Sequence, residues 1–267
     1  MGKFGAPIVK YIFCVSLLLI RPVLHCQEIE TVKSEENPQL LLAAPHGGYD
    51  LFTEKIVRDI AERSGFSTII AIGFRSIRKK RYINVNRPTE RLFHRGRLLK
   101  DEVHTLRARR VYTKYLAELK KITARTKREI RLYVEFHGNS RVLTRRKNIA
   151  GKLIFKKHRR NVIELATTGF GLSFLRRLKK KYKQIIPNSG FVPLRIACLD
   201  GTYQLQHRHA TFIFKARGAR LRGIFRSDVI KYGLHFELPI YLRRTEEKRE
   251  SLVRIFSRLL LWVAKEL

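Results

Sequence analysis

The stretch "LLLAAPHGGYDLFT", residues Leu40–Thr53, decides the fold that we expect. Its first five residues are apolar and the run ends at Pro45, as a buried strand does when a turn follows. His46, two glycines, a tyrosine and Asp50 come next, before a helical pattern begins at Leu51. The stretch therefore predicts a strand, a glycine loop and a helix, with an imidazole and a carboxylate beyond the end of the strand.

Apolar segments of strand length alternate with amphipathic segments along the rest of the chain. The chain has 267 residues and no internal repeat, so one domain is the simplest organisation. The alternation indicates an α/β fold with a mixed central sheet flanked by helices. Beyond the first unit, which Gly65 closes, strands are expected at 67–74, 130–138, 161–169, 203–215 and 234–242, and helices at 101–127, 172–184, 227–232 and 246–267.

The first 26 residues have the pattern of an export signal. Lys3 and Lys10 stand in a short basic start, and the apolar run Tyr11–Ile20 is broken by "RPVLHCQ". A bilayer span needs about 20 apolar residues, so this run is short for a transmembrane helix. We expect a signal peptide cleaved near Cys26 and an exported domain at 27–267, which is secreted, periplasmic or membrane-associated. An uncleaved N-terminal anchor is the alternative.

The chain is strongly basic. It has 57 Lys and Arg residues against 22 Asp and Glu residues, for a formal net charge of +35. The runs "RSIRKKRY", "KKHRR" and "RRLKKKYK" spread this charge along the chain, which predicts electrostatic association with an anionic polymer or membrane surface. Nucleic acid would also be attracted, but the sequence has no specific nucleic-acid motif of the RNP, helix-turn-helix or zinc-finger kind.

Two histidines and a carboxylate favour a metal site. The three cysteines contain no C-x-x-C pair, which excludes a cysteine-built structural zinc site. Catalytic zinc takes three ligands from His and Asp or Glu and keeps a fourth position open. His46, Asp50 and His137 supply such a set if their strands end at the same edge of the sheet. We expect one Zn²⁺ per chain; in the alternative interpretation, Asp50 only caps the following helix.

Four further polar residues lie where a substrate or a metal ligand would need them. Glu237 stands in an otherwise apolar strand and is the candidate general base; an ordinary ion pair with an arginine is the alternative. Asn86 and Arg87 offer an amide and a guanidinium fork that suits a substrate carboxylate. Glu135, two residues before His137 on the same strand face, is a candidate to orient that histidine; an exposed edge carboxylate is the alternative.

From about residue 40 to residue 244, the chain resembles the N-formylglutamate amidohydrolase family, which is related to zinc carboxypeptidases. The motifs "APHGGYDLFT", "INVNRPTE", "VEFHGN" and "FELPIYLR" look, in this order, like its first metal loop, its Asn-Arg-Pro segment, its second metal histidine and its late catalytic glutamate. The resemblance implies a carboxypeptidase-like α/β fold, a single zinc ion and hydrolysis of an amide bond near a carboxylate.

The resemblance also implies roles by position. It makes His46, Asp50 and His137 the metal ligands. Glu237 becomes the general base, and Arg87 becomes the anchor of a substrate carboxylate.

One departure from the family pattern concerns the third ligand. Related enzymes often carry a glutamate slightly later after His-Gly-Gly, whereas here Asp50 stands four residues after His46. This leaves Glu54 as the alternative third ligand. Arg141 and Arg145 are further candidates for substrate binding.

Two functions fit the sequence. The first is an exported zinc-dependent amidohydrolase acting on a small acidic or peptide-like substrate; N-formylglutamate-like, γ-glutamyl and cell-wall peptide substrates all stay open. The second is a non-catalytic basic protein with a hydrolase-like fold that binds nucleic acid or an anionic surface. The ligand set favours the enzyme, and the sequence does not indicate an oligomeric state.

Overall fold

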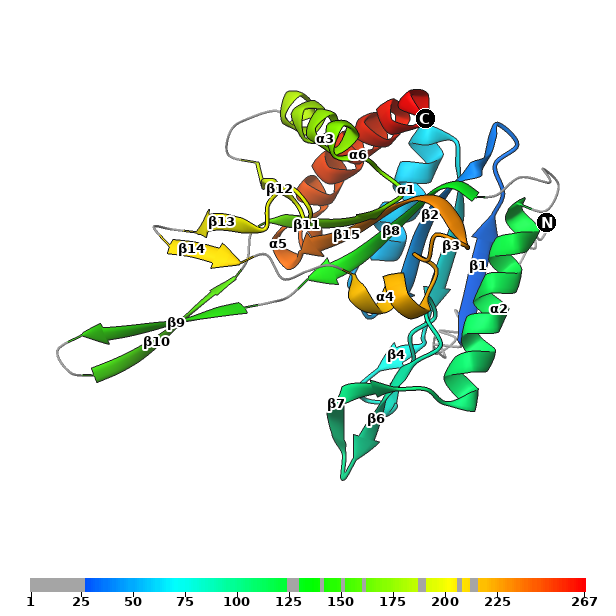
Figure 1. The fold of residues 1–267 in the computed structure, drawn as a ribbon. Helices are drawn as coiled ribbons and strands as arrows, with labels where there is room; N and C mark the ends of the chain where they lie inside the picture. The colour runs from blue at the N-terminus through cyan, green and yellow to red at the C-terminus, as the bar shows by residue number, and fades with distance from the viewer. Residues whose placement is uncertain are drawn as a thin grey trace, which may run out of the picture.

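A seven-stranded mixed sheet forms the centre of the computed structural model, in the order β1-β3-β2-β8-β15-β11-β12 (Figure 1). The proposed signal peptide, residues 1–26, lies outside the described part of the chain. Within that part, no helix has the length and apolar character that crossing a bilayer requires. The structure describes residues 27–123, 130–139, 142–149, 152–159, 162–186, 191–205, 208–211 and 216–267.

Four neighbouring strands run in parallel at the middle of the sheet: β3, β2, β8 and β15. β1 and β11 pair with the edges of this group in the antiparallel sense, and β12 pairs with β11 in parallel. Because parallel strands end at one edge, residues at the carboxyl ends of β2, β8 and β15 converge there. The strands are β1 (Glu28–Val32), β2 (Asn37–Gly47), β3 (Phe66–Ile72), β8 (Ile130–Asn139), β11 (Ile163–Thr168), β12 (Leu194–Ile196) and β15 (Ile230–Pro239).

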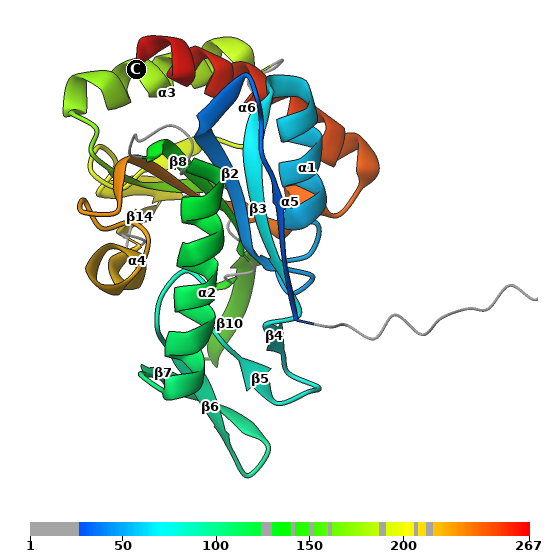
Figure 2. The ribbon, with the colours of Figure 1, turned by 90° about the vertical axis from the view of Figure 1, so that its right-hand side faces the viewer.

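Helices cover both faces of the sheet, as expected for this fold class. The buried residues of α1, α3 and α6 form one core with the sheet, and those of α2 and α4 form a second core on the opposite face. Figure 2 shows α1 and α2 on opposite sides of β2 and β3. The helices are α1 (Thr53–Ser64), α2 (Leu106–Thr123), α3 (Leu172–Ile185), α4 (Arg217–Arg222), α5 (Ile240–Arg243) and α6 (Glu246–Glu266).

Four two-stranded ribbons extend from this body. The first two are inserted between β3 and α2 and supply residues to the site described below. The ribbons are β4 (Arg75–Ser76) with β5 (Arg81–Tyr82), β6 (Glu90–His94) with β7 (Arg97–Val103), β9 (Val142–Ile149) with β10 (Lys152–Arg159), and β13 (Thr202–Leu205) with β14 (Arg208–Thr211).

The first unit forms as its sequence indicates. β2 leads through the glycine loop into α1, which buries Ile56, Val57 and Ile60 at helical spacing. The helix ends at Gly65, which adopts a left-handed conformation with φ 65° and donates its N–H to the carbonyl of Ala61. A glycine is suited to this position because it has no Cβ to clash at positive φ.

The expected mixed α/β fold in a single domain is confirmed, but several expected elements were wrong. The described part of the strand expected at 203–215 is the ribbon of β13 and β14, because residues 208–211 pair back on 202–205. The strand expected at 234–242 ends at Pro239, where α5 follows. The helix expected at 227–232 is a turn followed by β15, because Ile230 already pairs with Ile130 of β8. The helix expected from residue 101 begins at Leu106, because residues 97–103 form β7 and pair with β6. In both places, pairing with another strand overrides the local helical pattern.

Three phenylalanines that pack against one another join the sheet to α6. Phe136 of β8 and Phe236 of β15 stack with ring centroids 5.5 Å apart. Phe256 of α6 meets them edge-on at 5.2 and 4.8 Å. All three side chains are fully buried, so this cluster fixes the spacing of the two strands that carry the site.

Phe256→Ala is expected to lower the free energy of unfolding by about 3–5 kcal/mol, because it leaves a cavity where three rings now pack. Leu106→Ala on α2, where the side chain is 73% exposed, is the control and should change it by less than about 0.5 kcal/mol. Chemical denaturation measures both. Equal effects of the two variants would show that the aromatic cluster does not support the sheet.

Candidate metal centre and catalytic cavity

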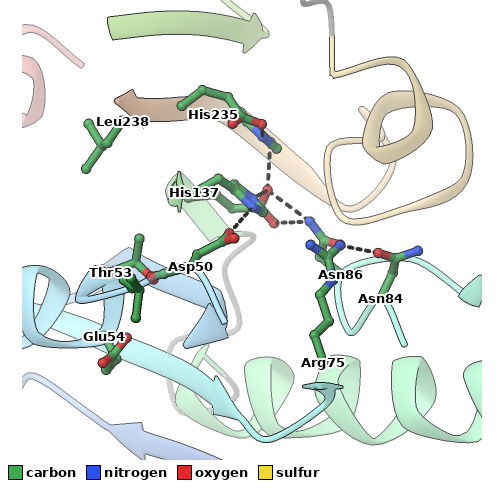
Figure 3. A network of polar contacts seen from close by, with 12 residues as sticks. Asp50, Thr53, Glu54, Arg75, Asn84, Asn86, His137, His235 and Leu238 are labelled. Atoms are coloured by element: carbon green, nitrogen blue, oxygen red, sulfur yellow. Dashed lines mark hydrogen bonds and ion pairs between the residues drawn. The ribbon is translucent and has the colours of Figure 1, made fainter. Parts of the chain in front are cut away.

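A cavity of about 950 Å³ opens at the carboxyl ends of β2, β8 and β15. His46, Asp50 and His137 line it, as do Glu237 and a further histidine, His235. The topology therefore brings together the three residues expected to bind metal and the residue expected to act as base. Figure 3 shows Asp50, His137 and His235 approaching one another from different elements of the fold.

His46 has the state that a metal ligand requires. Its ring is buried at the end of β2, and neither ring nitrogen has a hydrogen-bond partner within the described residues. Burial, with a further contribution from the nearby positive charge of Arg75, lowers the pKa of His46 well below its usual value. The imidazole is therefore neutral, and a lone pair is available to a cation.

Asp50 and His137 face each other across the cavity. Oδ2 of Asp50 lies 3.5 Å from Nδ1 of His137, whose ring centroid lies 4.9 Å from that of His46. The structure does not support side-chain capping by Asp50: its carbonyl oxygen accepts the hydrogen bonds from Thr53, while its carboxylate points to the histidine. Burial raises the pKa of Asp50, but the contacts with His137 and Arg75 outweigh it and lower the pKa.

His137 lies between two carboxylates. Its Nδ1 faces Asp50, and its Nε2 lies 3.1 Å from Oε2 of Glu135. Burial lowers the pKa of His137, but the contacts with Asp50 and Glu135 outweigh this effect and raise the pKa to about 9. The surroundings of Nδ1 thus stabilise a positive charge, and a metal cation at Nδ1 would take the place of the proton.

Glu135 is a fully buried carboxylate with four donor groups around it. Asn86, labelled in Figure 3, donates its Nδ2 hydrogens to both oxygens at 3.1 and 3.2 Å. Tyr133 donates its hydroxyl at 2.9 Å. His137 and His235 contact Oε2 at 3.1 and 2.8 Å. Burial raises the pKa of Glu135, but the hydrogen bonds from the two histidines outweigh it and lower the pKa, so the group is ionised.

Two groups of side chains have the composition of a metal site, and they share His137. Glu135, His137 and His235 place ligand-type atoms within 4.8 Å of one another. The donors around Glu135 already use its lone pairs, so binding a metal there would break existing hydrogen bonds. Among the described residues, neither nitrogen of His46 has a hydrogen-bond partner to give up, which makes the set of His46, Asp50 and His137 the better fit. Glu135 then orients His137 through Nε2, the ring nitrogen on the side away from Asp50, which is a common arrangement in metal sites.

Glu54 is a weaker candidate for the third ligand than Asp50. Its carboxylate accepts a hydrogen bond from the backbone N–H of Gly48 at 3.1 Å, and it is not among the residues that line the cavity. Glu54 therefore stabilises the glycine loop that carries His46, whereas Asp50 faces the site.

Arg87 lines the cavity, but its guanidinium already holds a carboxylate. Nε and Nη2 of Arg87 donate to the two oxygens of Glu102 at 2.9 and 2.5 Å. Burial raises the pKa of Glu102, but the hydrogen bond and charge of Arg87 outweigh it and lower the pKa to about 2. A substrate carboxylate would have to compete with Glu102 for this arginine.

Of the other expected substrate-binding residues, the structure describes the side chain of Asn86 alone. Asn86 is buried beneath it and supports Glu135, so its position does not favour a substrate contact. Arg141 lies outside the described residues, and Arg145 belongs to β9, whose side chains are also outside the description.

Arg75 was not anticipated from the sequence. It lies in the β4–β5 ribbon and lines the cavity, with its guanidinium over the ring of Tyr82 at 4.6 Å and against Asn84. Its Nε is buried and has no partner within the described residues (Figure 3). Nothing in the sequence distinguishes Arg75 from the many other arginines, because its position depends on the ribbon.

Comparisons with known proteins support the fold. No protein-family model matches this chain, and no curated protein matches its sequence. Among solved structures, the gene product Atu2144 from Agrobacterium tumefaciens is similar, with a TM-score of 0.51 and 11% identity over 91% of this chain and 97% of that one. A bacteriophage poly-gamma-glutamate hydrolase has a TM-score of 0.45 and 12% identity over 91% of each chain. At 11% identity the likeness to Atu2144 concerns the fold alone, and the resemblance to N-formylglutamate amidohydrolases stays a prediction.

The purified protein is expected to bind about one zinc ion per chain, as catalytic sites of this ligand type do. His46→Ala and His137→Ala should each abolish tight binding, because each removes an imidazole from the set. His94→Ala, at an exposed position in β6, is the matched control and should retain the metal. Metal analysis after dialysis measures all four proteins, and full occupancy in either site variant would remove the proposed centre.

Asp50→Asn and Glu54→Gln separate the two candidates for the third ligand. Asp50→Asn should weaken zinc binding strongly, because a neutral amide replaces a charged ligand. Glu54→Gln should leave the affinity within a few-fold, because Glu54 contacts only the loop backbone. Competition with a chromophoric chelator gives the affinities; the reverse order would assign the ligand to Glu54.

Proposed function

We propose that the protein is a zinc-dependent amidohydrolase that cleaves an amide bond near a carboxylate. The observation that carries the proposal is the convergence of His46, Asp50 and His137 with Glu237 in one cavity. A two-histidine, one-carboxylate set with a nearby carboxylate that is not a ligand is the arrangement used for hydrolysis assisted by zinc.

Glu237 is positioned to move protons in this cavity. When bound, zinc supplies Lewis-acid chemistry that polarises a carbonyl and acidifies water. Glu237 pairs in register with His137 across β15 and β8, so its carboxylate lies at the same level of the sheet as the proposed ligand. There it would accept a proton from the attacking water and deliver it to the nitrogen of the leaving amine.

The cavity walls support an acidic substrate. Among the described lining residues, Asp50, Glu102 and Glu237 supply three carboxylates, against six cationic side chains. These are Arg75, Arg87, Arg91, Lys100, Arg217 and Arg243. An excess of fixed positive charge in a concave site attracts and orients anionic substrates. The proposed substrates are therefore small N-acyl or γ-linked acidic amides or peptide-like amides.

The net charge of +35 favours a second activity alongside catalysis, or a different function. We propose electrostatic association with an anionic polymer or membrane surface, through cations outside the cavity. Export through residues 1–26 would bring the protein to such surfaces. A non-catalytic binding protein is the alternative, and it would show salt-dependent binding without hydrolysis of any amide.

Glu237→Gln separates chemistry from binding. Glutamine is nearly isosteric but cannot accept a proton at neutral pH, so zinc content and KM should hold while kcat falls by about 10²–10⁴. A panel of N-acyl and γ-linked glutamates supplies the substrates, with metal content measured in the same samples. Turnover within a few-fold of the parent would show that another residue is the base.

Glu102→Gln tests whether Arg87 binds the substrate carboxylate. The change releases the arginine from its internal partner, so KM for an anionic substrate should fall. Arg87→Lys replaces the bidentate fork with a point charge, and KM should rise by about tenfold, or ~1.4 kcal/mol, with zinc retained. If neither variant changes KM, Arg87 is a structural residue and the anchor is another of the cavity cations.

A further inference from the structure

Two mirrored tripeptides lie side by side at the floor of the cavity. Strand β8 carries Glu-Phe-His at 135–137, and β15 carries His-Phe-Glu at 235–237. The two strands are parallel and in register, so each glutamate stands beside a histidine of the other strand. The phenylalanines between them point to the opposite face and stack, which holds the register.

The four polar side chains form one connected cluster. Glu135 contacts His137 at 3.1 Å on its own strand and His235 at 2.8 Å on the neighbouring strand. The two imidazoles stack almost parallel, with centroids 4.1 Å apart and an interplanar angle of 7°. Nε2 of His235 lies 3.7 Å from Oε1 of Glu237, which connects Glu237 to this cluster.

Each imidazole nitrogen of His235 faces one carboxylate: Nδ1 faces Glu135 and Nε2 faces Glu237. An ionised carboxylate only accepts hydrogen bonds, so the Nδ1 that faces Glu135 carries a hydrogen. Nε2 then faces Glu237. The two atoms are 3.7 Å apart, which is within the range of an ion pair and beyond that of a direct hydrogen bond.

We propose that His235 is the positioning residue for Glu237, holding its carboxylate on the cavity side next to the proposed zinc ligands. The proposal rests on the proposed function, since it assigns Glu237 to the proton-transfer step. Glu135 fixes the ring plane of His235 through Nδ1, Phe225 meets the ring edge-on at 5.4 Å, and His137 stacks on its face. A ring held on three sides orients the flexible carboxylate in front of it.

Two amide substitutions divide the ring of His235 into its two contacts. His235→Asn places an amide where Nδ1 now lies, so it keeps the contact with Glu135 and loses the one with Glu237. His235→Gln reaches the position of Nε2 and does the opposite. His94→Asn, at an exposed position in β6, controls for loss of a histidine.

In the first experiment, steady-state kinetics and zinc content are measured together. His235→Asn should lower kcat by about 10–100-fold with KM and zinc unchanged, His235→Gln should stay within a few-fold, and His94→Asn should match the parent. In the Glu237→Gln background, His235→Asn should cause no further loss, because its effect passes through that carboxylate. Equal losses in the Asn and Gln variants, or losses that add in the double variant, overturn the proposal.

A second experiment needs no substrate, and so separates this proposal from the proposed function. Nitrogen-15 NMR of the zinc-loaded protein resolves the ring nitrogens of His235, with the assignment made by loss of the signals in His235→Asn. Glu237→Gln should shift the Nε2 signal of His235 and leave the signals of His94 in place. An unshifted Nε2 signal overturns the proposal even if turnover is found, whereas a shifted signal in a protein without turnover supports the contact and refutes the proposed hydrolase.

Discussion

The buried carboxylate of Glu135 is the interaction on which the site depends. An ionised carboxylate removed from water costs several kcal/mol unless hydrogen bonds replace its hydration. Here an amide, a hydroxyl and two imidazoles replace it, and they come from β8, β15 and the segment before β6. Because its contacts come from all three, Glu135 ties these elements together at the floor of the cavity.

The same carboxylate determines what the cavity can bind. By accepting from Nε2 of His137, Glu135 leaves Nδ1 of that ring towards Asp50 and the cavity. His46 completes the set from β2, where burial keeps it neutral. The neutral imidazole of His46 and the Nδ1 of His137, whose proton a metal would replace, lie beside an ionised carboxylate and suit a cation, while the surrounding arginines make the outer cavity a site for anions. This division of charge suits a metal at the floor and an acidic substrate above it.

Much of the fold and of the candidate site could be predicted from the sequence, and there are physical reasons why the rest could not. The apolar runs and the glycine loop were enough to predict β2, α1 and the convergence of His46, Asp50 and His137, because parallel strands end at one edge. The two-residue spacing to His137 made Glu135 a candidate to orient that histidine, and its burial and its contact with Nε2 needed the structure. His235 was missed as a site residue, although the mirrored Glu-Phe-His and His-Phe-Glu tripeptides were a readable signal. Their meaning depends on β8 and β15 being neighbours in register, which local patterns do not specify.

The arginines were harder to place, since 57 basic residues make each of them a weak signal. Arg87 was expected to face a substrate, but the β6–β7 ribbon brings Glu102 against it. Arg75 reaches the cavity through the β4–β5 ribbon, whose two short strands leave no clear pattern in the sequence. The geometry of these two ribbons, and not residue type, determines which arginine side chains line the cavity.

Anomalous diffraction at the zinc absorption edge, from crystals of the zinc-loaded protein, tests the central claim most directly. The arrangement around Glu135 predicts a single ion next to Nδ1 of His137, with ligand atoms of His46 and Asp50 at about 2.0–2.2 Å and Glu135 still hydrogen-bonded to Nε2. An ion among Glu135, Nε2 of His137 and His235 would contradict the claim, because Glu135 would then be a ligand. An absence of zinc from the cavity would contradict it as well.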